Sequence, residues 1–204
     1  MNKNAEIIRN TLKMYKEKRD AANAKVDRIR EDYGEEAAKK ELERQNNLLK
    51  ASRAAAESAI RAAAGDARRD AEAWGRMDGS KLTDDIKLLD AGLVDAATFH
   101  DLKERYKDNG TMLAALKKYG DKQNAAAMKE AHDKGGIALA APYDVLDIPT
   151  VEEKTQVWDK AQNHAFDMLD AMDGAGKYGD PRNWGAAMVK NTLQAQIDNF
   201  GENL

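Results

Sequence analysis

Residues 12–33 read LKMYKEKRDAANAKVDRIREDY and carry the clearest helical periodicity of the chain. Steps of three and four residues pick out one face of a helix: Leu12, Tyr15, Arg19, Ala22, Val26, Ile29 and Tyr33. Arg19 is the only charged member of this face, and the spacing is the a/d pattern of a coiled coil, kept for about three heptads. The stretch therefore predicts a long N-terminal helix that turns this face towards another helix.

A second helical run is predicted from Glu35 to about Trp74, and it is rich in alanine. Its centre, residues 51–64, reads ASRAAAESAIRAAA. Alanine has the best intrinsic helix propensity, and its small side chain lets another helix come close. Gly34 separates the two runs, and a glycine is unfavourable inside a helix. Two arrangements are open: an antiparallel hairpin turning at Gly34, or one long helix that pairs with another chain.

The domain boundary is predicted at a short break in the helical pattern, GRMDGS at residues 75–80. Two glycines and a serine within six residues are typical of a linker. The chain is therefore expected to divide into a helical arm or coiled coil at 1–77 and a compact helical domain at 78–204.

The predicted compact domain contains several shorter helices. Residues 81–134 form a cluster of three amphipathic helices joined by short turns, and residues 135–149 form a loop. Two further helices are expected at 150–173 and 181–200. Thr150 and Glu153 have the spacing of a capping box, in which each side chain accepts a hydrogen bond from the other residue's backbone N–H. The predicted fold class is all-α, with a long N-terminal arm or hairpin followed by a compact multi-helix domain.

Composition and charge narrow the classes of function. The 204 residues contain no cysteine and carry a formal net charge of −3, so disulfide bonds and thiolate metal sites are excluded. Basic residues of the arm alternate with acids and lack the interleaved aromatic residues that stack on bases, which makes nucleic acid an unlikely default partner. No run approaches the roughly 20 apolar residues of a membrane span, and the first twelve residues do not resemble a signal peptide.

The search for reaction chemistry yields no catalytic motif. His100, His132 and His164 have no second ligand at metal-binding spacing, and we interpret them as surface or boundary residues. The aspartates of residues 167–180 depart from the register of a calcium loop and follow helical spacing instead. GxSxG, P-loop and GxGxxG patterns are absent from the sequence. We therefore expect a protein that is not an enzyme and that uses no catalytic residue, metal or cofactor.

Residues 81–122 carry a family resemblance. The matching elements are Leu82-Thr83, Lys87-Leu88-Leu89, Leu102, Tyr106, Asn109 and Thr111-Met112-Leu113. In these elements the segment resembles small proteins of tailed bacteriophages and prophages of Gram-positive bacteria. The resemblance covers about a fifth of the chain and implies a protein of the virion-structure or head-assembly group. It also implies a location in the host cytoplasm or the virion.

The expected function is that of a non-enzymatic phage structural or assembly protein, similar to a scaffold, that oligomerises and docks a partner through helices. The predicted oligomerisation residues are Leu12, Tyr15, Ala22, Val26, Ile29 and Tyr33. The expected partners are further copies of the chain and other phage structural proteins, without a membrane. A helical binding or regulatory module, which could be a nucleic-acid accessory protein, is the alternative.

Overall fold

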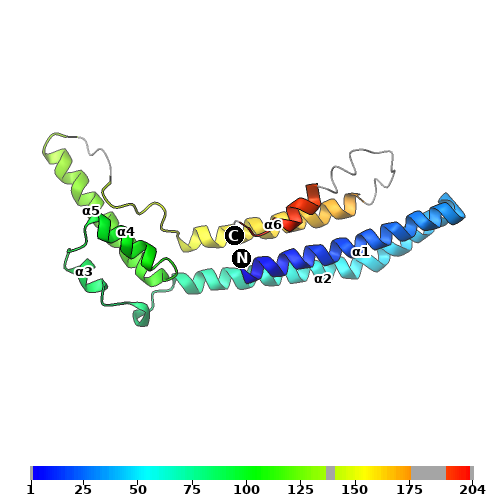
Figure 1. Cartoon of the computed structure of the whole chain (residues 1–204), viewed down its shortest axis with the longest axis horizontal. Helices are drawn as coiled ribbons and strands as arrows, with labels where there is room; N and C mark the ends of the chain where they lie inside the picture. The colour runs from blue at the N-terminus through cyan, green and yellow to red at the C-terminus, as the bar shows by residue number, and fades with distance from the viewer. Residues whose placement is uncertain (1, 137–140, 176–191, 203–204) are drawn as a thin grey trace. The chain divides into compact units, whose positions relative to one another are not determined.

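The computed structural model describes residues 2–136, 141–175 and 192–202, and their regular structure is entirely helical. Figure 1 shows α1 (Lys3–Tyr33), α2 (Glu35–Gly75), η1 (Gly79–Lys81), α3 (Ile86–Asp90), α4 (Ala96–Arg105), α5 (Gly110–Asp133) and α6 (Val151–Ala175). Residues 192–198 form a further short helix. The prediction of an all-α fold with a long N-terminal helical segment is confirmed.

Helices α1 and α2 pack side by side as a hairpin, which decides between the two arrangements that the sequence left open (Figure 1). Gly34 makes the turn with a φ of 85°, a backbone conformation that favours glycine, and its N–H donates to the carbonyl of Arg30. Lys25 on α1 pairs with Glu41 on α2 at 2.9 Å. Hydrogen bonds from Gln45 and Lys25 lower the pKa of Glu41 to about 2, so this cross-hairpin pair stays charged through mildly acidic pH.

The chain divides into two compact units, and the first is discontinuous in sequence. Unit 1 consists of residues 1–68 and 156–204, and unit 2 of residues 69–155. This division differs from the predicted boundary between residues 77 and 78. The physical reason is that most of α6 and the residues that follow α6 complete the core of the hairpin. Helical periodicity reveals which face of a segment is buried but not which distant segment covers it.

The core of unit 1 lies between the hairpin, α6 and the C-terminal residues. Ile8 and Leu12 of α1, Ile60 of α2 and Leu169 of α6 are completely buried. The other members of this core are Ala5, Tyr15, Ala56, Ala63, Ala67, Trp158, Ala161, Ala165, Met168, Met172, Leu193, Ile197 and Phe200. Small alanines on α2 face larger side chains from α6, so the helices approach closely and the three layers interdigitate.

The core of unit 2 is a separate cluster built by α3, α4, α5 and the segment before α6. Phe99 and Leu116 are almost completely buried. The rings of Tyr143 and Phe99 meet edge to face, with their centroids 5.3 Å apart. Asn124 holds the backbone of Tyr143 from both sides, donating to its carbonyl at 2.7 Å and accepting from its N–H at 3.0 Å. This pair fixes the segment after residue 140 against α5 without a strand partner.

Several local predictions are also confirmed in the described residues. The three helices expected within 81–134 are present as α3, α4 and α5, and α5 is the longest of them with 24 residues. Thr150 and Glu153 form the predicted capping box, in which each side chain accepts the other's backbone N–H. The predicted helix 150–173 corresponds to α6, whereas residues 181–191 of the last predicted helix lie outside the described residues.

Candidate functional site in the helical hairpin

The candidate site begins with a buried charge on α1. Arg19 occupies a core position of the heptad pattern and is only 7% exposed. One terminal nitrogen donates to Asn46 Oδ1 at 2.8 Å and the other to the backbone carbonyl of Asp173 at 3.3 Å. Its Nε makes no hydrogen bond within the described residues. A buried guanidinium requires compensation, and α2 and α6 supply most of it.

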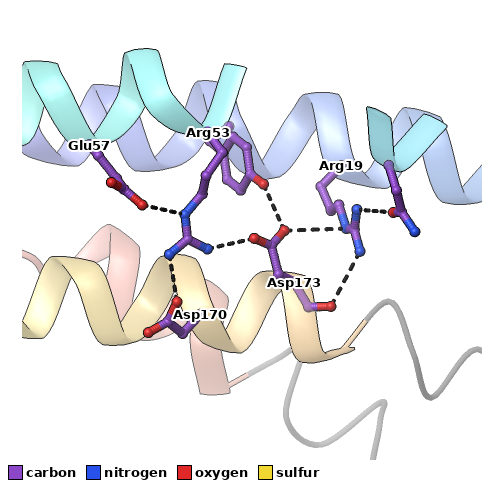
Figure 2. A network of polar contacts seen from close by, with 7 residues as sticks. Arg19, Arg53, Glu57, Asp170 and Asp173 are labelled. Atoms are coloured by element: carbon purple, nitrogen blue, oxygen red, sulfur yellow. Dashed lines mark hydrogen bonds and ion pairs between the residues drawn. The ribbon is translucent and has the colours of Figure 1, made fainter. Parts of the chain in front are cut away.

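Asp173, near the end of α6, is the centre of the network (Figure 2). Its Oδ1 accepts from the Tyr15 hydroxyl at 2.7 Å, and its Oδ2 accepts from Arg53 at 2.5 Å. The Arg19 Nε lies 3.7 Å from Oδ1, in ion-pair range. One carboxylate therefore connects α6 to both helices of the hairpin, through a tyrosine and two arginines.

Arg53 on α2 contacts three carboxylates (Figure 2). It pairs with Glu57 at 2.9 Å and with Asp170 and Asp173 at 2.5 Å each. Burial alone would lower the pKa of this guanidinium, but hydrogen bonds to Asp170, Glu57 and Asp173 outweigh burial, so the pKa lies above its usual value. Arg53 therefore holds a fixed charge that bridges two neighbouring turns of α6 to α2.

Beside the network lies a cavity of about 320 Å³. It is lined by Tyr15, Arg19, Leu42, Asn46, Leu49, Lys50, Arg53, Ala54, Glu57 and Asp173. Lys50 and Ala54 are exposed, so the cavity reaches solvent. Its wall combines apolar side chains with three cationic and two carboxylate side chains. The volume is at the lower end of the range, roughly 300–1,000 Å³, of pockets that bind small molecules.

Near neutral pH the Tyr15 hydroxyl and the two arginines of this arrangement serve as hydrogen-bond donors. Burial and then the hydrogen bond to Asp173 raise the pKa of Tyr15 to about 12, so its hydroxyl stays protonated. The two arginines are permanently charged. The network can therefore hold helices in register and offer fixed positive charge to a bound group.

The structure brings together four of the six predicted oligomerisation residues inside a single chain. Leu12, Tyr15, Ala22 and Val26 are at most 7% exposed, Ile29 is half-buried and Tyr33 is 73% exposed. Leu12 and Tyr15 belong to the core formed with α2 and α6. Burial of this face is thus achieved without a second chain, and the role of these residues in oligomerisation stays a prediction.

The network was not predicted, although the sequence contains one signal that points to it. Arg19 was the one charged residue on an otherwise uncharged face, and a charge in that position needs buried partners. The sequence does not show which aspartates of α6 are the partners, because Asp167, Asp170 and Asp173 follow one another at the same spacing of three residues. In the structure Asp167 is exposed, whereas Asp170 and Asp173 pair with Arg53.

The histidines and the aspartate-rich segment form no metal site among the described residues. His100, His132 and His164 are all exposed, and His164 stacks on Phe200 with the ring centroids 6.2 Å apart. Among the described residues no group of three or more His, Cys, Asp or Glu side chains could hold a metal ion. The part of the 167–180 segment after Ala175 lies outside the described residues.

Comparisons with known proteins do not place the chain in a family. No protein-family model matches it, and no curated protein or solved structure matches it either. The described helices include none that is long and apolar enough to span a membrane.

Replacing Asp173 with asparagine should destabilise unit 1 by about 2 kcal/mol, because it removes the negative charge between two buried or half-buried arginines. Chemical denaturation followed by far-UV circular dichroism measures this loss. Asp167→Asn, an exposed aspartate two turns earlier on the same helix, is the matched control and should change stability by less than about 0.5 kcal/mol. Equal effects of the two substitutions would show that the network does not stabilise the unit.

The raised pKa of Tyr15 makes stability depend on alkaline pH. Between its model-compound pKa of 10.0 and its folded pKa of about 12, the hydroxyl ionises in the unfolded chain but not in the folded one. Its contribution is therefore complete below about pH 10 and lost by about pH 12, a decrease of roughly 2 kcal/mol. Tyr15→Phe should remove this decrease, measured as the difference in unfolding free energy between wild type and variant across that range. A difference that does not change with pH would contradict the assignment.

Proposed function

We propose that this protein is a non-enzymatic structural or assembly protein that works through helix-mediated contacts with other copies of itself. The observation that carries the proposal is an exposed face on the hairpin that is apolar or uncharged except at Lys18, and it contrasts with the charged network. On α1, Ile7 is 38% and Met14 59% exposed, and on α2 Leu48 is 60% exposed. Apolar side chains grouped on one surface are typical of a contact site.

The face continues along α2 at helical spacing. Leu48 is followed by Ala51, Ala55, Ser58 and Ala62, and all five are exposed. The steps of three and four residues keep these side chains on one side of the helix. Small, uncharged side chains over four turns permit the close approach of another helix. This face, hereafter the hairpin face, comprises Ile7 and Met14 with these five α2 residues.

The two halves of the hairpin face are neighbours. Lys18, one turn after Met14, donates a hydrogen bond of 3.5 Å to Ser52, one turn after Leu48. Residues four apart on a helix lie on the same side, so Met14 and Leu48 flank the same seam between α1 and α2. A second hairpin packed on this seam would form a four-helix arrangement, the usual way to bury such a surface.

The resemblance of residues 81–122 to proteins of tailed phages and prophages supports the more specific part of the proposal. On this basis the assembly is a virion or precursor head, and other phage structural proteins are the further partners. Mass spectrometry of particles released by the cell that encodes the protein tests this part. Detection of the chain in particles or precursor heads is expected, and its consistent absence would contradict the phage assignment.

Self-association is tested by light scattering of the full-length protein at micromolar concentration. We expect an oligomer that the double substitution Met14→Glu and Leu48→Glu converts to a monomer. The matched control is Met128→Glu with Leu93→Glu, which alters equally exposed side chains of unit 2 (59% and 72%) and should leave the oligomer intact. A monomeric wild type would overturn the proposal, and a salt-sensitive gel shift with DNA or RNA would favour a nucleic-acid accessory role instead.

A further inference from the structure

We propose that the 320 Å³ cavity beside the Arg53 network is a binding site for a small monocarboxylate that carries a short apolar chain. The site is distinct from the hairpin face and does not depend on self-association. Its walls come from α1, α2 and α6 of unit 1, so a ligand there would contact all three helices of the same core.

The charges of the wall define the head group of the ligand. Arg53 pairs with Glu57, Asp170 and Asp173, and Arg19 lies in ion-pair range of Asp173. Lys50, the third cation of the wall, has no ion pair among the described residues. A ligand with one negative charge can therefore pair with Lys50, whereas a cation would be repelled.

The hydrogen-bonding groups favour an acceptor. Lys50 keeps donor capacity, because its ammonium carries three N–H groups and donates to the Asn47 side chain at 2.8 Å on the exposed side of the helix. A carboxylate offers about four lone-pair sites and no donor, so it suits a wall in which donors are in excess.

The apolar part of the wall defines the rest of the ligand. Leu42, Leu49 and Ala54 line the cavity on α2, and Leu49 is 7% exposed. Each methylene placed against such a surface contributes about 0.8 kcal/mol when it leaves water. A volume at the small end for ligand pockets selects a short chain. Octanoate has this combination of a single carboxylate and a short apolar chain.

Isothermal titration of the full-length protein with octanoate tests the site, with acetate and 1-octanol as probes of its two halves. We expect octanoate to bind at least tenfold more tightly than either probe. Equal binding of 1-octanol would overturn the role of the positive charge, and equal binding of acetate would overturn the role of the apolar wall. No detectable binding of octanoate would overturn the proposal as a whole.

Two exposed alanines give a matched pair of variants that locates the site. Ala54 on α2 lines the cavity, whereas Ala24 on α1 neither lines it nor belongs to the hairpin face. Both side chains are exposed, so Ala54→Trp and Ala24→Trp should both fold, which circular dichroism checks. Ala54→Trp should weaken octanoate binding at least tenfold, and Ala24→Trp should leave it unchanged. Lys50→Met should weaken octanoate at least threefold without weakening 1-octanol. Equal effects of the two tryptophans would place the binding elsewhere and refute the assignment.

Discussion

Ile60→Ala should lower the unfolding free energy of unit 1 by about 4 kcal/mol, the largest effect that we expect from a single substitution. Ile60 lies on α2 and is completely buried in the core shared with α1 and α6. Its truncation removes the transfer free energy of the lost methyl and methylene groups and leaves a cavity, which together cost about 2–5 kcal/mol at such positions. The upper part of this range applies because large side chains from α6 face small alanines and cannot collapse into the space.

The measurement is thermal unfolding followed by circular dichroism, in which the midpoint should fall by about 10 °C. Lys39→Ala is the control, because Lys39 is on the same helix but is exposed. Its effect should remain within about 0.5 kcal/mol. Comparable losses for the two variants would mean that Ile60 is not in a packed core, and the described arrangement of α6 against the hairpin would be wrong.

Gly110→Ala should destabilise unit 2 by about 3 kcal/mol. A Cβ atom on Gly110 would lie 2.0 Å from the carbonyl oxygen of Trp74 and 2.8 Å from the Trp74 ring. The closest atom belongs to the backbone, so no side-chain rotation relieves the overlap and the first turn of α5 must move away. The close approach of α5 to the end of α2 therefore depends on the absence of a side chain at this position.

Gly174→Ala provides the contrast, since a Cβ there would meet no atom of the described residues within 4 Å. Gly174 lies within α6. Alanine should stabilise the fold there by about 0.5 kcal/mol, because it lowers the conformational entropy of the unfolded chain. In urea denaturation, we expect the unfolding free energy to fall in the Gly110→Ala variant and to rise in the Gly174→Ala variant. A Gly110→Ala protein as stable as wild type would show that α2 and α5 are further apart than described.

Much of the architecture follows from local patterns in the sequence. The heptad spacing from Leu12 to Val26 predicted the buried face of α1, and the capping box at Thr150 located the start of α6. Gly34 marked the position of the hairpin turn but could not decide whether the chain reversed there. Such features depend on side chains that are close in sequence, so they can be predicted from short segments of the sequence.

The candidate site could not be predicted, because it is made by residues far apart in the chain. Arg19, Arg53 and Asp173 come from three helices, and nothing in the spacing of any one helix indicates the other two. The heptad face was expected to pack on another helix, either in a hairpin or from another chain, and its residues Leu12 and Tyr15 lie in the core formed with α2 and α6 of the same chain. Amphipathic periodicity specifies that a face is buried and leaves its partner undetermined.

Because unit 1 combines residues 1–68 with residues 156–204, a fragment that lacks either part cannot form its core. A fragment that begins at residue 78 contains α6 but lacks the hairpin against which Trp158, Met168 and Leu169 are buried. Such a fragment would expose these apolar side chains, and its association could reflect that exposure. Point substitutions in the full-length chain therefore test self-association more cleanly than truncation does.

The discontinuity of unit 1 also sets an order of events during synthesis on the ribosome. Residues 69–155 form a contiguous unit and can fold as soon as they emerge, whereas the hairpin made earlier waits for residues 156–204. At roughly 5–20 residues per second, synthesis of residues 69–204 takes roughly 7–27 s. During that interval Ile8, Leu12 and Ile60 have no α6 to cover them. The nascent hairpin is thus the part of the chain that is most dependent on chaperones and most prone to premature pairing with a neighbouring nascent chain.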